Sequence, residues 1–344
     1  MLKQKKFFSI ITCVLLIFVF TSCKKTNVEP VAKSNIVLGT FCTVTVYDKV
    51  STDVLEKVFD ELSTIEDKMS INKDTSEVIN INSKSGLDYV NVSDDTFYVI
   101  QKGTYYSQLS NGKFDISIGP IVKLWNIGTD KARLPSTEEI KNKLPLVNHK
   151  NILINQAEKK VMLNKKDMRL DLGGIAKGYA ADEAKKILKE NGVNHAIINL
   201  GGNILTLGNK PNKSNWKLGV QNPFEPRGKY LGTLKVADKS VVTSGVYERY
   251  FEKDGKRYHH ILNPKDGYPV TNSLVSVSII SDNSIDGDAL STTAFALGLN
   301  DGLKLIESLD NIDAIFVTKD SDIYISSGLK NIFEIKNDKF KLKN

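Results

Sequence analysis

Residues 171–180 read Asp171-Leu172-Gly173-Gly174-Ile175-Ala176-Lys177-Gly178-Tyr179-Ala180. Apolar residues recur at helical spacing from Ile175 to Ala184, so the stretch predicts a helix over residues 171–190 that opens at the glycine pair. The first turn of a helix exposes unpaired backbone N–H groups at the positive end of the helix dipole, where anions bind. With Lys177 close by, the pattern indicates a place to hold a phosphate. The alternative is a tight turn whose glycines only permit close packing, and the stretch fits neither a Walker A loop nor a Gly-x-Gly-x-x-Gly fingerprint.

In the rest of the chain, expected strands and helices intermix without the strict alternation of a doubly wound sheet. The expected helices cover residues 52–69, 94–109, 119–125, 137–144, 286–297 and 301–309. The expected strands cover residues 36–47 with a break near Gly39, then 89–92, 152–154, 160–163, 196–200, 216–220, 230–236, 240–244, 247–252 and 275–280, with three more near the end of the chain. This order predicts a single mixed domain of the α+β class over residues 36–336.

The N-terminus has the pattern of a secretory signal peptide. Three lysines precede a mostly apolar run over residues 7–20, and Thr21 and Ser22 stand before Cys23. A cysteine directly after the cut is similar to a bacterial lipobox, so we expect residues 1–22 to be a signal peptide and Cys23 to carry lipid. Residues 23–35 would then tether the domain to the extracytoplasmic face of the cell membrane. The alternatives are an ordinary signal peptide or an uncleaved anchor, for which the apolar run is short.

Cysteine count and charge exclude several classes of protein. Cys13 lies in the signal and Cys23 at its end, so Cys42 alone remains and the mature domain has no intramolecular disulfide and no thiolate metal site. Cys42 lies in a strand-like run and is expected in the core. The formal charge of +7 includes the three signal lysines, which leaves about +4 for the mature chain. Lysines and acids are interspersed without a basic stripe, so nucleic acid is not an expected partner.

Two further clusters are candidates for chemistry. Asp288 and Thr292 are four residues apart, on one face of the helix expected over residues 286–297. A carboxylate and a hydroxyl are hard oxygen ligands that suit Mg²⁺, although Asp286 or Asp288 could instead cap the helix. His259 and His260 precede the turn-forming residues 263–267, which makes a base or a ring-stacking group available there. The four histidines have no zinc-ligand spacing.

Together these segments resemble the ApbE family of FAD:protein FMN transferases, also called flavin-trafficking lipoproteins. The resemblance runs from about Val37 to Ser326, and the number and order of its short motifs make it specific. The motifs are Leu38-Gly39-Thr40, Gly112 to Pro120 with Leu124-Trp125, Asp171 to Tyr179, Asn199 to Asn203, Thr243-Ser244-Gly245, His260 to Gly267 and Asp288 to Ala294.

The resemblance implies transfer of the FMN half of FAD to a threonine or serine hydroxyl of a target protein, with release of AMP and use of Mg²⁺. It assigns the metal to Asp288, Thr292 and the backbone carbonyl of Gly174. It assigns FAD contacts to Asp171 and Lys177. It assigns the flavin site to Leu38, Trp125, Asn126, Ile127 and Ile261. Asn72 stands where the family often has a tyrosine that stacks on FAD, and Asn126 replaces a common glycine.

The hydroxyl of the acceptor needs a proton acceptor, and His260 is the candidate because a neutral imidazole is available near pH 7. Asp288 is the alternative base. Two other functions stay open: an FAD pyrophosphatase, in which water replaces the acceptor, and a non-catalytic lipoprotein that binds flavin. For a transferase, the resemblance implies an extracytoplasmic subunit of an electron-transfer complex as acceptor.

Overall fold

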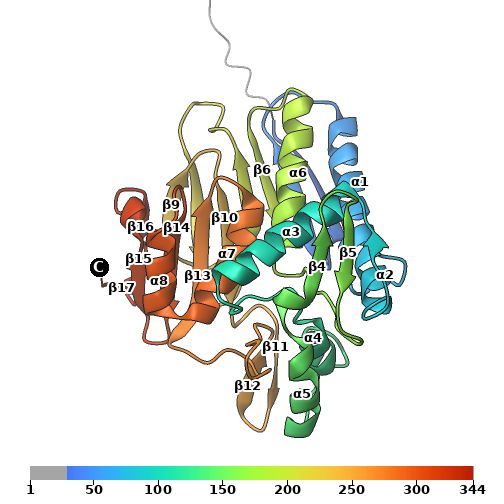
Figure 1. Ribbon diagram of the computed structural model, residues 1–344. Coiled ribbons are helices and arrows are strands. Elements are labelled where there is room, and N and C mark those ends of the chain that lie inside the picture. Colours follow the sequence, from blue (N-terminus) through green and yellow to red (C-terminus); the bar gives the residue numbers. More distant parts are fainter. Residues whose placement is uncertain (1–28, 344) are drawn as a thin grey trace, which may run out of the picture.

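The computed structural model describes residues 29–343, and within these residues nine strands form the central sheet (Figure 1). The strand order is β1-β2-β6-β7-β10-β13-β14-β15-β17. Neighbouring strands pair antiparallel, except that β15 and β17 are parallel. The strands are β1 (Val31–Val37), β2 (Thr40–Val46), β6 (Ala196–Leu200), β7 (Asn203–Leu207), β10 (Ser240–Gly245), β13 (Leu274–Ser281), β14 (Asp313–Thr318), β15 (Asp322–Ile325) and β17 (Lys341–Leu342).

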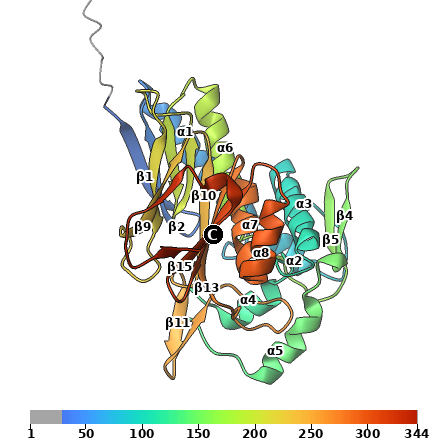
Figure 2. The same ribbon diagram turned by 90° about the vertical axis from the view of Figure 1, so that its left-hand side faces the viewer.

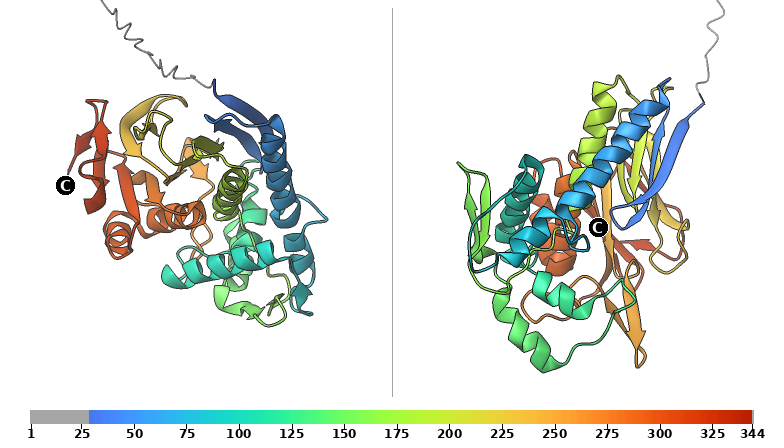
Figure 3. Two further views of the ribbon diagram at one scale, coloured as in Figure 1. Left: turned by 90° about the horizontal axis from the view of Figure 1, so that it is seen from above. Right: turned by 90° about the vertical axis from the view of Figure 1, so that its right-hand side faces the viewer.

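Helices cover one face of this sheet and a smaller sheet covers the other. The covering helices are α1 (Thr52–Met69), α3 (Asp94–Leu109), α6 (Ala176–Glu190), α7 (Ser284–Leu297) and α8 (Leu299–Glu307). In Figure 2, α6, α7 and α8 lie to the right of the strands, and Figure 3 shows α1 beside α6. On the opposite face, β8 (Trp216–Gln221), β9 (Tyr230–Val236) and β16 (Phe333–Ile335) enclose a second hydrophobic core.

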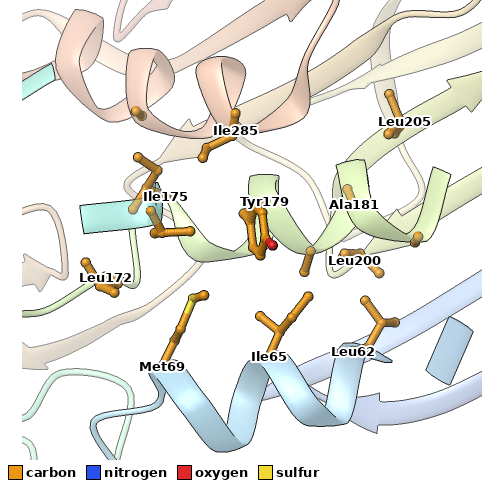
Figure 4. Packing of buried hydrophobic residues seen from close by; sticks show 14 of the residues in the cluster. Leu62, Ile65, Met69, Leu172, Ile175, Tyr179, Ala181, Leu200, Leu205 and Ile285 are labelled. Carbon is orange, nitrogen blue, oxygen red and sulfur yellow. The ribbon is translucent and has the colours of Figure 1, made fainter. Parts of the chain in front are cut away.

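Helix α6 is the centre of the main core. It packs between α1 and α7, as Figure 4 shows for Tyr179, with Ile65 and Met69 of α1 on one side and Ile285 of α7 on the other. The apolar stripe of α1 is buried and the Ser51 side chain caps the helix, because its hydroxyl accepts a hydrogen bond from a first-turn amide. Each fully buried aliphatic side chain of such a core contributes about 1.5–3 kcal/mol.

A smaller group of elements projects from one end of the sheet (Figure 1). Its own hydrophobic cluster joins α4 (Gly119–Trp125), α5 (Thr137–Lys143) and a hairpin of β11 (Tyr250–Lys253) and β12 (Lys256–His259) around the buried Trp125 ring. The remaining regular elements are α2 (Glu77–Ser83), β3 (Val90–Asn91), β4 (Ile152–Asn155), β5 (Lys160–Leu163) and three short 3-10 turns, Leu144–Leu146, His149–Asn151 and Ser327–Leu329.

The predicted α+β class is confirmed, and the bounds of α1, α4, β6 and β9 agree with those expected from the sequence. Cys42 is fully buried in β2 and unpaired, and burial raises the pKa of its thiol to about 11. Elements α2, β7 and β12 were not expected, and β11 begins at Tyr250 rather than Tyr247. The folded region is also wider than residues 36–336, since β1 starts at Val31 and β17 reaches Leu342.

The prediction of a helix beginning at residue 171 is wrong. Helix α6 begins at Ala176, and the glycine pair lies in the turn before it. Two sets of hydrogen bonds stabilise the turn. The Asp171 side chain accepts a hydrogen bond from the amide of Gly173, and the carbonyl of Leu172 accepts from the amides of Ile175 and Ala176. The expected signal peptide and Cys23 lie outside the described residues. Among residues 29–343, no helix is both long enough and apolar enough to cross a membrane.

Candidate active site

The turn before α6 carries a carboxylate, Asp171, and the first turn of α6 carries a lysine, Lys177, and both side chains contact Gly173. Asp171 accepts a hydrogen bond from the amide of Gly173 at 2.7 Å, and Lys177 Nζ donates to the carbonyl of Gly173 at 3.2 Å. Burial raises the pKa of Asp171 above its ordinary value, while the Gly173 hydrogen bond and the charges of Lys177 and Arg249 act in the opposite direction. One amide of the glycine pair is therefore already occupied, and Lys177 supplies the mobile positive charge of this turn.

Helix α7 carries the predicted pair of oxygen ligands. Asp288 is 4% exposed and accepts a hydrogen bond from the amide of Gly178 at 2.9 Å through Oδ2. Its other oxygen, Oδ1, lies 3.8 Å from Lys177 Nζ. Neither Asp286 nor Asp288 caps α7, because the helix starts at Ser284 with Asn283 in the capping position. The alternative that Asp288 is only a helix cap is therefore excluded.

Thr292 lies one turn further along α7, in a group of hydroxyls. Its Oγ1 is 3.1 Å from Ser244 Oγ at the end of β10, and Ser244 Oγ is also 2.8 Å from Ser291 Oγ. A Cβ placed on Gly174 would lie 3.7 Å from Thr292 Oγ1 and 3.1 Å from the buried ring of Phe114. The turn before α6, the end of β10 and the middle of α7 thus meet at Thr292.

These oxygen groups suit a hard cation. The described residues contain no cluster of three or more His, Cys, Asp or Glu side chains that could hold a metal. Mg²⁺ does not need such a cluster, since it is usually bound by one or two carboxylates together with water and substrate phosphates. A site made of the Asp288 carboxylate, the Thr292 hydroxyl and the Gly174 carbonyl fits that preference and leaves positions for a substrate.

Arg249 joins the loops that the flavin was expected to contact. Its Nη2 donates to the carbonyl of Gly39 at 3.4 Å, and a Cβ on Gly128 would lie 3.2 Å from Arg249 Cδ. Both loops are tightly turned: Leu38 has φ 57° beside Gly39, and Asn126 has φ 49° at the end of α4. Leu38, Asn126 and Ile127 are partly exposed there.

His260 is held by the backbone of the same arginine. The carbonyl of Arg249 accepts from the amide of His260 at 3.1 Å and lies 3.2 Å from His260 Nδ1. A proton on Nδ1 makes that second contact a hydrogen bond and leaves Nε2 as the free acceptor. Burial, helped by the charges of Arg249 and Lys177, lowers the pKa of His260 to about 4, so the ring is neutral at pH 7.

Trp125 and Ile261 lie behind these loops rather than at their surface. Trp125 has no exposed surface, and its Nε1 donates to the carbonyl of Gly267 at 2.7 Å. Ile261 is 4% exposed. Both residues therefore belong to the hydrophobic interior, whereas Asn126 and Ile127 are partly exposed.

The structure thus brings the predicted residues into two groups. One group surrounds Asp288 and Thr292, and the other lies around the flavin loops with His260. Lys177 links them, because its charge acts on both Asp171 and His260. Two hollows on the described surface lie elsewhere, one beside the 263–272 turn and one between α3, α7 and the loop at residues 309–312, and neither contains a predicted site residue. Sequence reasoning gave no role to Ser244, Gly178 or Arg249. A glycine inside an apolar helix was the signal available for Gly178, since it indicates a close approach of two backbones.

Comparison with known proteins identifies the family of the chain. A family model described as the ApbE family matches residues 38–316. An FAD:protein FMN transferase of Klebsiella pneumoniae (strain 342) is 42% identical over 271 residues, which are 79% of this chain and 84% of the relative. An FAD:protein FMN transferase of Treponema pallidum (strain Nichols) is 34% identical over 335 residues, 92% of each chain.

A solved structure has the same fold. The ApbE protein of Thermotoga maritima superposes with a TM-score of 0.82 at 31% identity, over 88% of this chain and 99% of that one. The match of both sequence and fold over most of the chain confirms the resemblance seen in the motifs. This chain belongs to the ApbE family.

Proposed function

We propose that this chain is an FAD:protein FMN transferase, which moves the FMN part of FAD to a threonine or serine hydroxyl of an acceptor protein and releases AMP. Its relatives carry that name, and the candidate site offers the groups that the reaction needs. The observation that carries the proposal is the position of Asp288 beside Lys177, with Thr292 and Gly174 close together. This arrangement combines a cation site with a positive side chain, as pyrophosphate chemistry requires.

The reaction exchanges one P–O bond for another. The acceptor oxygen bonds to the phosphorus on the FMN side, the bond from that phosphorus to the bridging oxygen breaks, and AMP leaves with that oxygen. Negative charge grows on the departing phosphate, and Lys177 is placed to stabilise it. A bound Mg²⁺, held by Asp288, Thr292 and the Gly174 carbonyl, would supply Lewis-acid charge to the pyrophosphate oxygens.

The acceptor hydroxyl gives up a proton during this exchange, and His260 Nε2 is the proposed acceptor of that proton. The backbone carbonyl of Arg249 orients the ring through Nδ1, as a base requires. Asp288 is less suited to the role, because both of its oxygens already face hydrogen-bond or charge partners, Gly178 and Lys177. A pKa of about 4 makes His260 a weak base that is always available at neutral pH.

The test uses the purified protein with FAD, Mg²⁺ and a protein domain that contains a candidate flavinylation threonine. Acceptor mass and AMP release are followed with and without EDTA. We expect the acceptor to gain the mass of FMN and AMP to appear only when Mg²⁺ is present. Free FMN with AMP and an unmodified acceptor would instead establish an FAD pyrophosphatase, and FAD that is bound but intact would establish a flavin-binding protein.

We also propose that the mature protein is anchored by lipid on Cys23 at the extracytoplasmic face of the cell membrane, where its acceptor is a subunit of an electron-transfer complex. The support is the signal-like sequence of residues 1–22 and the small residues before Cys23. Membrane fractionation of a Cys23→Ala variant tests this. We expect the wild-type protein in the membrane fraction with acylated Cys23, and the variant without lipid.

A further inference from the structure

The first turn of α7 is not capped by the side chain of its own N-cap residue. Its capping residue, Asn283, makes no capping hydrogen bond through its side chain. The amides of Ser284 and Ile285, which have no partner inside the helix, instead donate to Asp182 on α6. The distances are 2.7 Å from Ser284 N to Oδ1 and 2.8 Å from Ile285 N to Oδ2. One carboxylate of α6 therefore satisfies both amides at the start of α7.

The same side of α6 meets α7 through backbone contact one turn earlier. A Cβ on Gly178 would lie 2.3 Å from the carbonyl oxygen of Ser284 and 2.6 Å from the Cα of Ile285, so only glycine fits. The Gly178 amide then reaches Asp288 Oδ2 at 2.9 Å. Asp182 and Gly178 are four residues apart on α6. Asp182 holds the first amides of α7, and Gly178 holds the Asp288 carboxylate.

The start of α7 is also held from the sheet. Ser284 Oγ donates to Asn203 Oδ1 of β7 at 2.8 Å and accepts from Ser240 Oγ of β10 at 2.9 Å. These contacts fix the Ser284 side chain, whereas Asp182 fixes the backbone. A slide of α7 by one residue would move Asp288 by about 1.5 Å along the axis, and Mg²⁺ sites require ligands at about 2.0–2.1 Å in near-octahedral geometry.

We infer that Asp182 is a positioning residue for metal binding: it fixes the register of α7 on α6 so that Asp288 and Thr292 face the Gly174 turn together. The inference rests on the proposed function, because the metal site is part of that proposal. Asp182 does not touch the reacting atoms and acts only through α7. Loss of Asp182 should therefore lower the affinity for the metal. It should also reduce the protection of the Ser284 and Ile285 amides from hydrogen exchange.

The experiment compares Asp182→Ala with Asp48→Ala. Asp48 is a matched control, since its carboxylate also accepts from two consecutive backbone amides, Asn194 N and His195 N, both at 2.7 Å. A milder variant, Asp182→Asn, keeps one carbonyl acceptor and decides the question if Asp182→Ala does not fold. Mn²⁺ binding is measured by electron paramagnetic resonance, with ADP supplied as a pyrophosphate that has no flavin to transfer. Hydrogen exchange is measured at Ser284 and Ile285.

We expect Asp182→Ala to weaken Mn²⁺ binding about 10- to 100-fold, the usual cost of losing a group that orients a metal ligand, and Asp182→Asn to lie between it and the wild type. Exchange at Ser284 and Ile285 should accelerate in both variants, and Asp48→Ala should bind Mn²⁺ within about twofold of the wild type. Wild-type affinity in a folded Asp182 variant would overturn the inference alone. A wild-type protein that binds no Mn²⁺ would overturn the metal part of the proposed function as well.

Discussion

The two halves of the candidate site are built in different ways. Where α6 crosses α7, backbone meets backbone, and Asp288 is buried and held by an amide at 2.9 Å. Around the expected flavin loops, the main link is the exposed Arg249 side chain, whose contact with Gly39 is 3.4 Å long. The first half is fixed by sterics and short hydrogen bonds. In the second half, an exposed side chain reaches between two tight turns.

Within the proposed function, this difference predicts different roles for the two halves. Chemistry on a pyrophosphate needs ligands placed within a fraction of an ångström, and a tight helix crossing provides that. In the proposed function, recognition of a large flavin would tolerate loops that adjust on binding, and the arginine between two turns would serve that recognition. Changes at the crossing should therefore alter the metal requirement, and changes at Arg249 should alter the affinity for FAD.

Asp288→Asn tests the α6–α7 half of the site most directly, because it removes the one carboxylate of the proposed metal site. We expect Mg²⁺-dependent AMP release to fall about 10³-fold, as when a main charge-stabilising group is removed, with the fold intact. The control is Asp286→Asn on the same helix, since Asp286 pairs with Lys102 at 2.8 Å and lies away from the site. Full activity of Asp288→Asn would show that the metal assignment is wrong.

Gly178→Ala tests whether the close crossing matters for the metal. The added methyl would meet Ser284 O at 2.3 Å, so α6 and α7 must move apart, at a cost of about 1–3 kcal/mol in the free energy of unfolding. We expect the Mg²⁺ concentration for half-maximal AMP release to rise about tenfold.

Gly302→Ala is the matched control for that change. Its methyl would lie 2.7 Å from Ala294 O, at the crossing of α7 with α8 away from Asp288. We expect a similar loss of stability in thermal unfolding and an unchanged Mg²⁺ requirement. An equal shift in both variants would mean that the α6 crossing has no special role.

The sequence predicts local patterns of the site better than the contacts that position them, and for a physical reason. The stripe of α1 and the i, i+4 pair of Asp288 and Thr292 are local patterns, and both lie on helices as expected. The start of α6 was misplaced because the side chain of Asp171 and the carbonyl of Leu172 close the turn before the helix begins. A periodic pattern carries no information about such contacts.

Contacts between distant segments were not predictable at all. Asp182 caps a helix 102 residues later in the chain, and Arg249 reaches a turn 210 residues earlier. Neither contact leaves a local motif. The family resemblance predicted which residues form the site. The side chains that hold them in place, such as Asp182, could be identified only from the structure.

Arg249→Met tests the half of the site around the expected flavin loops. The variant keeps a long side chain against Gly128 but loses the donor to the Gly39 carbonyl and the charge near Asp171 and His260. We expect KM for FAD to rise roughly tenfold, about 1.4 kcal/mol, with a smaller change in kcat. Arg257→Met is the control, because Arg257 is also exposed but pairs with Glu252 and stacks on Tyr250. A fall in kcat with KM unchanged would place Arg249 in the chemical step instead.

A dependence of stability on pH separates the two neighbouring histidines. Burial lowers the pKa of both His259 and His260 to about 4, below the ordinary 6.5. Between these values the unfolded chain takes up protons that the folded chain does not, so stability falls as the pH drops from about 6.5 to 4, by at most about 1.4 kcal/mol per pH unit for each ring.

Removing either ring should reduce the slope of the unfolding free energy against pH. The contributions of all other titratable groups cancel when the variant is compared with the wild type. We therefore expect His259→Gln and His260→Gln to flatten the pH dependence of the unfolding free energy by similar amounts, measured by denaturant unfolding between pH 4.5 and 7. Only His260→Gln should also lower acceptor flavinylation, since His259 Nε2 lies 3.0 Å from the carbonyl of Val270, and its ring packs on Phe295. Equal losses of activity in both variants would show that the pair supports the loop and that His260 is not the base.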